Sequence, residues 1–339
     1  MARGALGRGA WNASVWARGV AARFALPPGA GVWLRLRLAP PLEELPLPTF
    51  GAPSLPLLEL LGVLERARED ERVDGVLLEL AGGVRGFAAA EALRRGVDAL
   101  GASGVAVIAF GERLSAEELL VACGARRLYV PEAGRIGLVG LRMEGFFLKD
   151  ALARLGVAPD VVRVGSFKTA GEMFTRGAMS AEQREQLEAL VEDRFDALVD
   201  GIARGRGLTP ERVRELGDRG PFTAREAAEA GLVDGCRHRD ELEAELEKQV
   251  PPRVAPPAGR IRLVDAASYH ALRVARRVRR PLRRDLARLS YVVAEGAIHA
   301  GSGLRGVAAD RYLALLGRLA PDPGVRGGVL RVASPGGDG

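Results

Sequence analysis

The sequence predicts an α/β fold in which buried strands alternate with helices. Its 339 residues, 47% of them hydrophobic, can bury a substantial core in one large domain or in two smaller ones. Short apolar runs recur between segments of helical spacing, and Gly or Pro clusters separate them. Layered α/β domains are typical sources of this pattern, and a largely disordered chain is excluded.

The first elements follow from the spacing of their apolar residues. In chain order we expect a strand over 32–38, a helix over 57–68, a strand over 73–80 that ends at Gly82-Gly83, a helix over 88–100, a strand over 105–110 and a helix that begins near Ser115. Glu118 lies three residues after Ser115, so the pair predicts a capping box at this helix start.

Three further helices are expected in the second half of the chain. Ser180 begins the clearest one, whose apolar stripe runs from Leu187 to Ile202. Thr209 and Thr223 begin two shorter helices.

The chain is predicted to contain a repeat. Residues 60–83 and 315–337 both read as a helix, a turn, a buried strand and a Gly pair. We therefore expect four parts, which are a basic amphipathic leader (1–31), a first domain (32–248), a Pro- and Arg-rich linker (249–285) and the start of a second, truncated copy of the domain (286–339).

The charge is concentrated in two segments. The chain has 49 basic and 43 acidic residues, and arginines cluster in residues 1–37 and 260–288. These segments predict peripheral contact with an anionic membrane, although a functionless leader and a solvated linker are equally simple interpretations. Nucleic acid is the least expected partner of the second basic segment, because no aromatic residue follows Tyr269 within residues 260–288. The sequence shows neither a membrane-spanning helix nor a secretory signal.

Lys168 is the strongest candidate for catalysis. Only three of the 49 basic residues are lysines, and arginine cannot act as a base because it keeps its proton. We expect Lys168 to lie poorly solvated between a β-branched strand over 161–164 and a turn at Gly171. A buried lysine loses its proton more readily, which suits the general base of a Ser–Lys dyad. The alternative is a surface salt bridge to Glu172.

Other chemistries find little support in the sequence. Three histidines and two cysteines show no metal-ligand spacing, so we expect no metal site and no disulfide. Ser-His-Asp catalysis has no candidate histidine, no phosphate-binding glycine loop is present, and no cofactor is expected.

Four segments of the chain resemble a known family. Residues 162–193 (VRVGSFKTAGEMFTRGAMSAEQREQLEALVED), 220–235 (GPFTAREAAEAGLVDG), 288–301 (RLSYVVAEGAIHAG) and 328–337 (GVLRVASPGG) are similar to the signal peptide peptidase A (SppA) family. The resemblance implies a ClpP/crotonase-like fold in the long two-domain form, and a bacterial, membrane-associated, homo-oligomeric serine peptidase that cleaves peptides.

The resemblance also assigns site residues. It places the base at Lys168 in the first domain and the nucleophilic serine in the second, beyond the point where this sequence stops. It assigns Gly82, Gly83, Gly336 and Gly337 to the oxyanion or substrate-binding turns, and Ser334 to a turn rather than to the nucleophile.

Ser115 is the alternative nucleophile. It lies 53 residues before Lys168, a spacing close to that of the single-domain members. Glu117 and Glu118 stand where the family has glycines, and their negative charge would oppose an oxyanion. A helix cap is the favoured interpretation of Ser115.

The predicted function is hydrolysis of apolar peptides, such as cleaved signal peptides, with Lys168 as base and a serine outside this chain. A non-catalytic scaffold half and a self-contained Ser115–Lys168 dyad are the alternatives. An acyl-CoA enzyme on the same fold is disfavoured, because no glutamate pair stands at the predicted strand ends.

Overall fold

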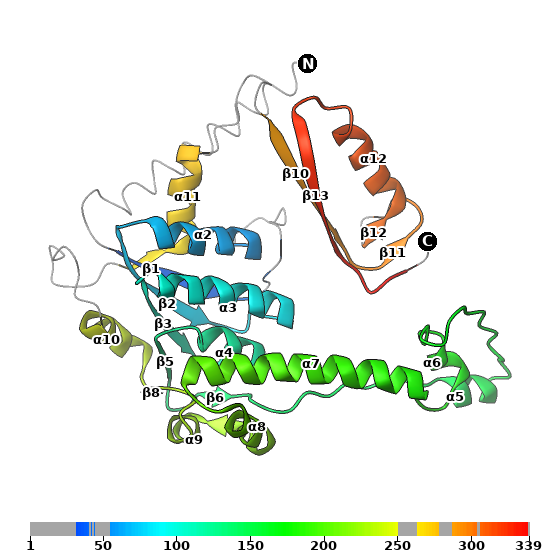
Figure 1. Cartoon of the computed structure of the whole chain (residues 1–339), viewed down its shortest axis with the longest axis horizontal. Helices are drawn as coiled ribbons and strands as arrows, with labels where there is room; N and C mark the ends of the chain where they lie inside the picture. Colours follow the sequence, from blue (N-terminus) through cyan, green and yellow to red (C-terminus); the bar gives the residue numbers. More distant parts are fainter. Residues whose placement is uncertain are drawn as a thin grey trace. The chain divides into compact units, whose positions relative to one another are not determined.

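A computed structural model describes residues 32–40, 42, 44, 55–249, 263–277, 287–303 and 306–337, and the chain divides into two compact units (Figure 1). The larger unit contains the described residues up to Arg273, and the smaller one contains those from Val274 onward. The predicted leader, residues 1–31, lies outside the described residues.

Six parallel strands form the central sheet of the larger unit, in the order β8-β5-β3-β2-β1-β9. The strands are β1 (Val32–Leu38), β2 (Val73–Leu80), β3 (Ala106–Gly111), β5 (Arg127–Val130), β8 (Gly235–Cys236) and β9 (Leu263–Asp265). All 8 residues of β2 are buried, as a parallel strand covered on both faces requires. The predicted α/β fold is confirmed, and β1 and β2 have the predicted bounds.

Helices cover both faces of this sheet. The helices α2 (Leu57–Glu69), α3 (Phe87–Ala102) and α4 (Ala116–Ala122) pack on one face, where Leu34 and Leu36 of β1 join their apolar residues in the main core. On the other face, α10 (Leu242–Gln249) places Leu242 and Leu246 against Trp33 in a smaller cluster. The central sheet therefore lies between two apolar layers.

The region predicted as a linker contributes to the larger unit. Within residues 249–285, β9 pairs with Trp33, Leu34 and Arg35 of β1, and α11 (Ala266–Arg277) follows it. Tyr269 of α11 is fully buried, and its hydroxyl donates to Asp70 Oδ2 at 3.0 Å. β9 has 3 residues, and Tyr269 is a single aromatic residue near many arginines, so neither segment shows a clear periodicity. The sequence interpretation therefore missed both β9 and α11.

Several short elements complete the larger unit. They are the three-stranded sheet of β4 (Arg113–Leu114), β6 (Arg135–Ile136) and β7 (Phe222–Thr223), the helices α8 (Pro210–Arg219) and α9 (Ala224–Glu229), and the 3-10 helix η1 (Arg239–Glu241). Thr209 and Thr223 cap α8 and α9 by accepting the backbone N–H groups of Arg212 and Glu226. The predicted starts of both helices are thus confirmed.

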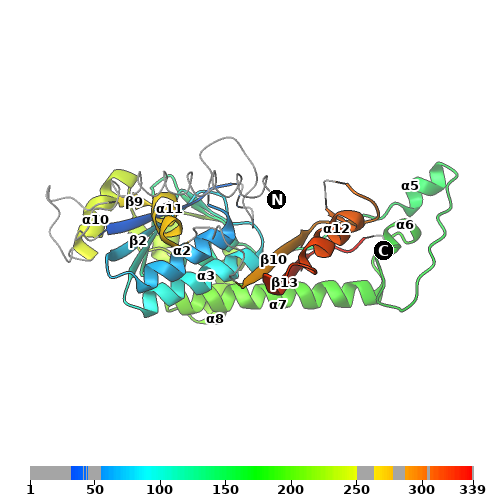
Figure 2. The same cartoon turned by 90° about the horizontal axis from the view of Figure 1, so that it is seen from above.

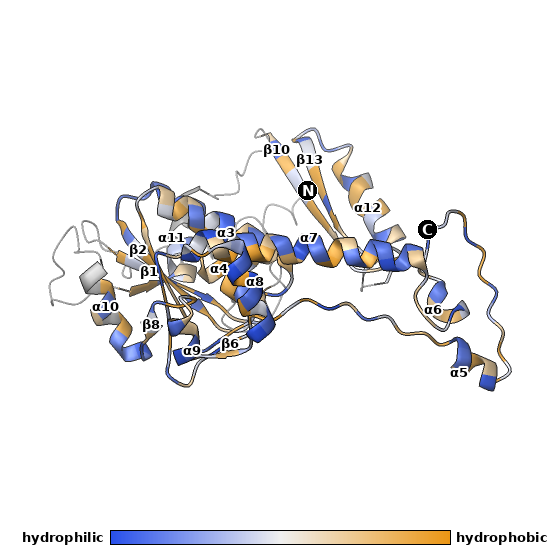
Figure 3. Cartoon of the chain, turned by 60° about the horizontal axis from the view of Figure 1, so that its bottom comes forward, coloured by the Kyte–Doolittle hydropathy of each residue, from blue (hydrophilic) through white to orange (hydrophobic). Residues whose placement is uncertain are grey.

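The helix α7 (Ala181–Arg206) is buried only in its last part, at residues that include Leu198, Val199 and Ile202. Ser180 caps it as predicted, by accepting the N–H of Gln183 at 3.1 Å. The first part of the expected stripe, at Leu187, is only half-buried, because α7 continues past the helices that cover the sheet (Figures 1 and 3).

Two glycines set how closely α7 approaches α4. A Cβ atom at Gly205 would overlap the carbonyl oxygen of Cys123, and one at Gly201 would overlap the Leu120 side chain. Arg94 of α3, 9% exposed, donates to the carbonyls of Leu120 at 2.9 Å and Gly201 at 3.0 Å. The three helices are therefore joined at one end of α7.

The other end of α7 carries residues 139–180, which we call the arm. It contains α5 (Lys149–Arg154) and α6 (Glu172–Thr175), both remote from the sheet in Figures 1 and 2. Several apolar residues of the arm are exposed, among them Phe146 (79%), Leu155 (77%), Val162 (92%) and Val164 (83%). The predicted strand over 161–164 is wrong, since no described strand lies beside these residues to pair with them.

The smaller unit repeats the strand–helix–strand path of the larger one. Its elements are β10 (Arg288–Glu295), β11 (Ile298–His299), β12 (Val307–Ala308), α12 (Ala309–Leu319) and β13 (Val325–Ala333). β10 pairs in parallel with β13, as β1 does with β2, and a Gly pair follows β13 as it follows β2. Within the described residues, no helix has the length and apolar character needed to cross a membrane.

We predict that Gly205→Ala destabilises the protein, because the added methyl group collides with backbone on α4. Overpacking of this kind costs about 1–3 kcal/mol. Gly101→Ala on α3 is the matched control, because a Cβ there meets nothing within 4 Å and alanine favours helix by about 1 kcal/mol. Urea unfolding followed by circular dichroism measures both variants. Equal stability of the two would contradict the close contact.

Candidate active site

Lys168 lies on an exposed turn of the arm. Its backbone N–H donates to Gly165 O at 3.4 Å, and Gly165 has a φ of +96°, which favours glycine. Arg163 donates to the Lys168 carbonyl at 3.3 Å. The expectation of a poorly solvated Lys168 is therefore not met within the described chain, because nothing in this unit covers the arm at that point.

Glu172 fixes this turn to the start of α7. Its carboxylate is 3% exposed and accepts from Arg163 at 2.9 Å and from the Ser180 N–H at 3.4 Å. Hydrogen bonding from the Ser180 side chain, followed by Arg163, lowers the pKa of Glu172. Glu172 thus holds Arg163 and Arg176 rather than forming the salt bridge to Lys168 considered as the alternative.

Ser115 is the N-cap of α4. Its hydroxyl accepts the Glu118 N–H at 3.2 Å, and the Glu118 carboxylate accepts the Ser115 N–H at 3.4 Å, which completes the predicted capping box. A serine hydroxyl at this position accepts a backbone N–H that would otherwise lack a partner at the start of the helix. Within the described residues, no general base contacts it.

The Glu118 carboxylate occupies the backbone donors beside Ser115. It is 2% exposed and accepts the Gly82 N–H at 2.7 Å. Burial raises the pKa of Glu118, and the N–H groups of Gly82, Ser115 and Val84 act against that shift. The turn after β2, assigned by resemblance to oxyanion binding, is therefore filled by a carboxylate of this same chain.

The two Gly pairs adopt the same backbone. Gly82 and Gly336 have φ of +81° and +102°, where glycine is favoured. Gly83 and Gly337 leave no room for a Cβ, which would meet the backbone of Leu38 and Ile298 respectively. The Gly336 N–H donates to Ser334 Oγ at 3.1 Å, so Ser334 belongs to this turn.

Ser115 and Lys168 lie at opposite ends of α7. The glycines that contact α4 are near the end of α7, whereas Glu172 binds Ser180 at its start. At 1.5 Å per residue, the 20 positions between Ala181 and Gly201 span about 30 Å. Figure 3 likewise shows α5 and α6 at the end of α7 remote from α4. The structure does not bring the candidate serine and lysine of one chain together.

Among the other titratable residues, His270 and Cys123 have pKa values that are shifted mainly by burial in the fold. Burial, with a smaller effect of Arg66, lowers the pKa of His270 to about 4. Burial also raises the pKa of the Cys123 thiol to about 12. Among the residues that the structure describes, no group of three or more His, Cys, Asp or Glu could hold a metal ion.

The sequence interpretation missed two contacts of carboxylates that shape the site. Glu118 was expected as a cap and as a charge opposing an oxyanion, but its hydrogen bond with the Gly82 N–H, 36 residues earlier in the chain, was not expected. Glu172 was considered only as a partner of Lys168. No local spacing signals either contact, since both depend on the path of the chain between the partners.

Comparisons with known proteins agree with the resemblance. Residues 99–251 match the model of Peptidase family S49. The chain is 26% identical over 299 residues to Protease 4 of Salmonella typhi, a match that covers 83% of this chain and 46% of that protein. It is 26% identical over 185 residues to the chloroplastic serine protease SPPA of Arabidopsis thaliana, covering 55% of this chain and 27% of that protein. The chain thus spans less than half the length of these two relatives.

Solved structures include a distant match. A serine-to-alanine mutant of the membrane-bound stomatin-specific protease 1510-N is 12% identical, with a TM-score of 0.40, and the match covers 69% of this chain and 97% of that one.

We predict that Glu118 makes stability depend on pH. Because its pKa is raised in the folded protein, the unfolded chain releases this proton first as the pH rises above the ordinary value of 4.5. The free energy of unfolding of the wild type, minus that of Glu118→Gln, should therefore fall as pH rises through that window. Urea titrations between about pH 4 and 7 measure this difference. A difference that grows with pH would show that the ionised form is favoured by folding.

Proposed function

Because residues 99–251 match the model of Peptidase family S49 and the chain is similar to SppA-type proteases, we propose that it acts in a serine peptidase that hydrolyses apolar peptides, such as cleaved signal peptides. In this proposal a Ser–Lys dyad performs the reaction. Lys168 is its general base, and the nucleophilic serine lies outside this chain.

The position of Lys168 is the observation that carries the proposal. Glu172 and Arg163 hold its turn in one conformation at the far end of α7, away from the sheet. An amine presented on an exposed, anchored turn is placed to meet a group from another molecule or domain. The neighbouring apolar residues would exclude water once that surface is covered, which favours the neutral amine.

The chemistry assigns one proton path to Lys168. Its neutral Nζ accepts the proton of the serine hydroxyl while the serine Oγ attacks the peptide carbonyl carbon, and the carbonyl oxygen becomes an oxyanion. Lys168 then returns the proton to the departing amine as the peptide C–N bond breaks, which leaves an acyl-enzyme. Water, activated by the same lysine, releases the acid. The turn at Gly336 and Gly337 is the proposed source of oxyanion donors, for which the Gly336 N–H would exchange its hydrogen bond to Ser334 Oγ for one to the oxyanion.

A self-contained Ser115–Lys168 dyad has less support. The Ser115 hydroxyl caps α4, and the Gly82 N–H beside it is taken by Glu118. A carboxylate at this position repels the oxyanion that acyl transfer develops. The same facts favour a second candidate function, in which this domain is a non-catalytic scaffold half within the peptidase.

Homo-oligomers are part of the proposal, because the arm exposes a set of apolar side chains. Val162, Val164 and Leu155 are 92%, 83% and 77% exposed, respectively. Contiguous apolar surface of this kind marks interaction sites. A second copy of the chain that covers the arm would bury these residues together with Lys168.

Peripheral contact with an anionic membrane also stays a proposal. The basic segments 1–37 and 260–288 that would make it lie largely outside the described residues.

Lys168→Arg should reduce turnover of a fluorogenic apolar peptide to background in the protein expressed from its intact gene, because arginine keeps its proton. Lys149→Arg, on α5 of the same arm and also exposed, is the matched control and should keep full activity. Activity of the Lys168 variant comparable to the control would remove Lys168 from the mechanism.

Val162→Asp should dissociate the oligomer, since it places a charge in the surface that a second copy would bury. Light scattering should then report a smaller particle than for the wild type. Leu58→Asp, at a 41% exposed apolar residue of α2 outside the arm, should leave the particle size unchanged. A wild type that is already a monomer would refute this part of the proposal.

A further inference from the structure

We propose that a cavity at the carboxyl ends of β1, β2 and β3 binds short peptides that have free amino and carboxyl ends, without hydrolysing them. The cavity has a volume of about 390 Å³, within the range of ligand sites in proteins. Open parallel sheets bind their ligands at this edge of the strands. The inference does not depend on the proposed peptidase activity.

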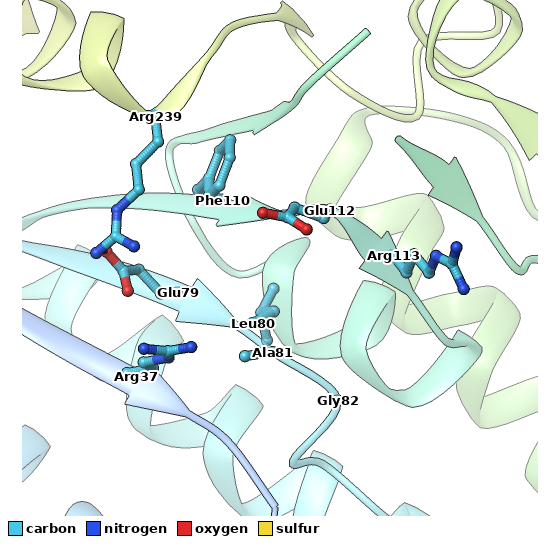
Figure 4. Close-up of a pocket in the computed structure, with 9 residues that line it drawn as sticks. All are labelled: Arg37, Glu79, Leu80, Ala81, Gly82, Phe110, Glu112, Arg113 and Arg239. Atoms are coloured by element: carbon cyan, nitrogen blue, oxygen red, sulfur yellow. Dashed lines mark hydrogen bonds and ion pairs between the residues drawn. The ribbon is translucent and has the colours of Figure 1, made fainter. Parts of the chain in front are cut away.

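Three neighbouring strands supply a row of side chains to this cavity (Figure 4). Arg37 of β1 is in register with Glu79 of β2, and Glu79 with Phe110 of β3. Glu79 is 6% exposed and forms an ion pair with Arg239 at 3.0 Å. The charges of Glu79 and Arg239 therefore largely cancel one another.

Three further charged residues line the cavity, namely Arg37, Glu112 and Arg113. All three are exposed to solvent and form no ion pair within the described part of the chain. Figure 4 shows the Arg37 guanidinium on one side of the cavity and the Glu112 carboxylate on another, whereas the Arg113 side chain extends away from the other labelled side chains. Arg37 and Glu112 thus offer one cation and one anion to a ligand, and Arg113 lies at the margin of the cavity.

This balance of charges selects the class of ligand. A phosphate or a dicarboxylate bound at Arg37 would have to place its second negative charge toward Glu112. A free peptide matches both groups, since its terminal carboxylate can accept the forked N–H groups of Arg37 and its ammonium group can donate to Glu112. Phe110 adds an apolar surface for a side chain.

The spacing of the strands agrees with a di- or tripeptide. Arg37 lies in β1 and Glu112 directly follows β3, and because β2 separates these two strands, the backbones of Arg37 and Glu112 lie about 10 Å apart across the sheet. Two or three extended residues span about 7–11 Å. The site is non-catalytic, because Glu118 already occupies the Gly82 N–H at its margin.

Calorimetric titration of the chain with the tripeptide Leu-Ala-Leu tests the proposal. We expect binding that weakens at least tenfold when the amino end is acetylated or the carboxyl end is amidated. Arg37→Ala should bind the free and amidated peptides equally, and Glu112→Gln should bind the free and acetylated peptides equally. These patterns identify which end each residue recognises, whatever the absolute affinity.

Lys168→Ala and Arg95→Ala, the latter at an exposed arginine of α3 outside the cavity, are the controls, and both should bind the free peptide like the wild type. Normal binding by Lys168→Ala would show that the peptide binds at a site that does not include the proposed catalytic lysine. Failure of the peptidase proposal would leave the titration unchanged. Equal binding of free and doubly blocked peptide, the absence of binding, or competition by inorganic phosphate would overturn the inference.

Discussion

The close contact of α7 with α4 determines where the chemical groups of the larger unit can lie. Because Gly201 and Gly205 lack side chains, the backbone of α7 contacts the Leu120 side chain and the Cys123 carbonyl at α4. Arg94 of α3 donates hydrogen bonds to the carbonyls of Leu120 and Gly201, which joins both helices to α3. Because α7 is anchored only at this end, its remaining turns project beyond the sheet. The arm and Lys168 are held at the other end of this rigid helix.

Two buried carboxylates then determine how the residues at the two ends of α7 are held. Glu172 orders the turn of Lys168 while leaving the amine exposed. Glu118 closes the turn after β2 by accepting the Gly82 N–H, so the serine beside it serves as a helix cap. One chain therefore presents Lys168, the proposed base, at a distance from Ser115, the candidate serine within the described residues. The cavity beside Gly82 keeps its charged groups and is free for binding rather than catalysis.

The sequence predicted the parts of this arrangement that local spacing determines. The bounds of β1 and β2 follow from apolar periodicity, and the capping box of Ser115 and the start of α7 at Ser180 follow from the spacing of these serines and the residues three positions later. The turn of Lys168 did not follow, because apolar neighbours such as Val162 and Phe167 indicate burial but not which molecule provides it. The contact of Glu118 with Gly82 and the pairing of β9 with β1 depend on chain topology, and periodicity carries no information about either.

The separation of Lys168 from Ser115 within one chain is the central claim, and a distance measurement by pulsed electron paramagnetic resonance tests it most directly. Spin labels at Arg113→Cys and Lys168→Cys, in a Cys236→Ser background diluted with unlabelled protein, report the distance within single chains. Cys123 is 1% exposed and should not react. The account predicts a distance on the order of 30 Å, the length of α7 between its two contacts. A main population below about 15 Å, half that length, would show that the arm folds back onto its own Ser115 and would contradict the account.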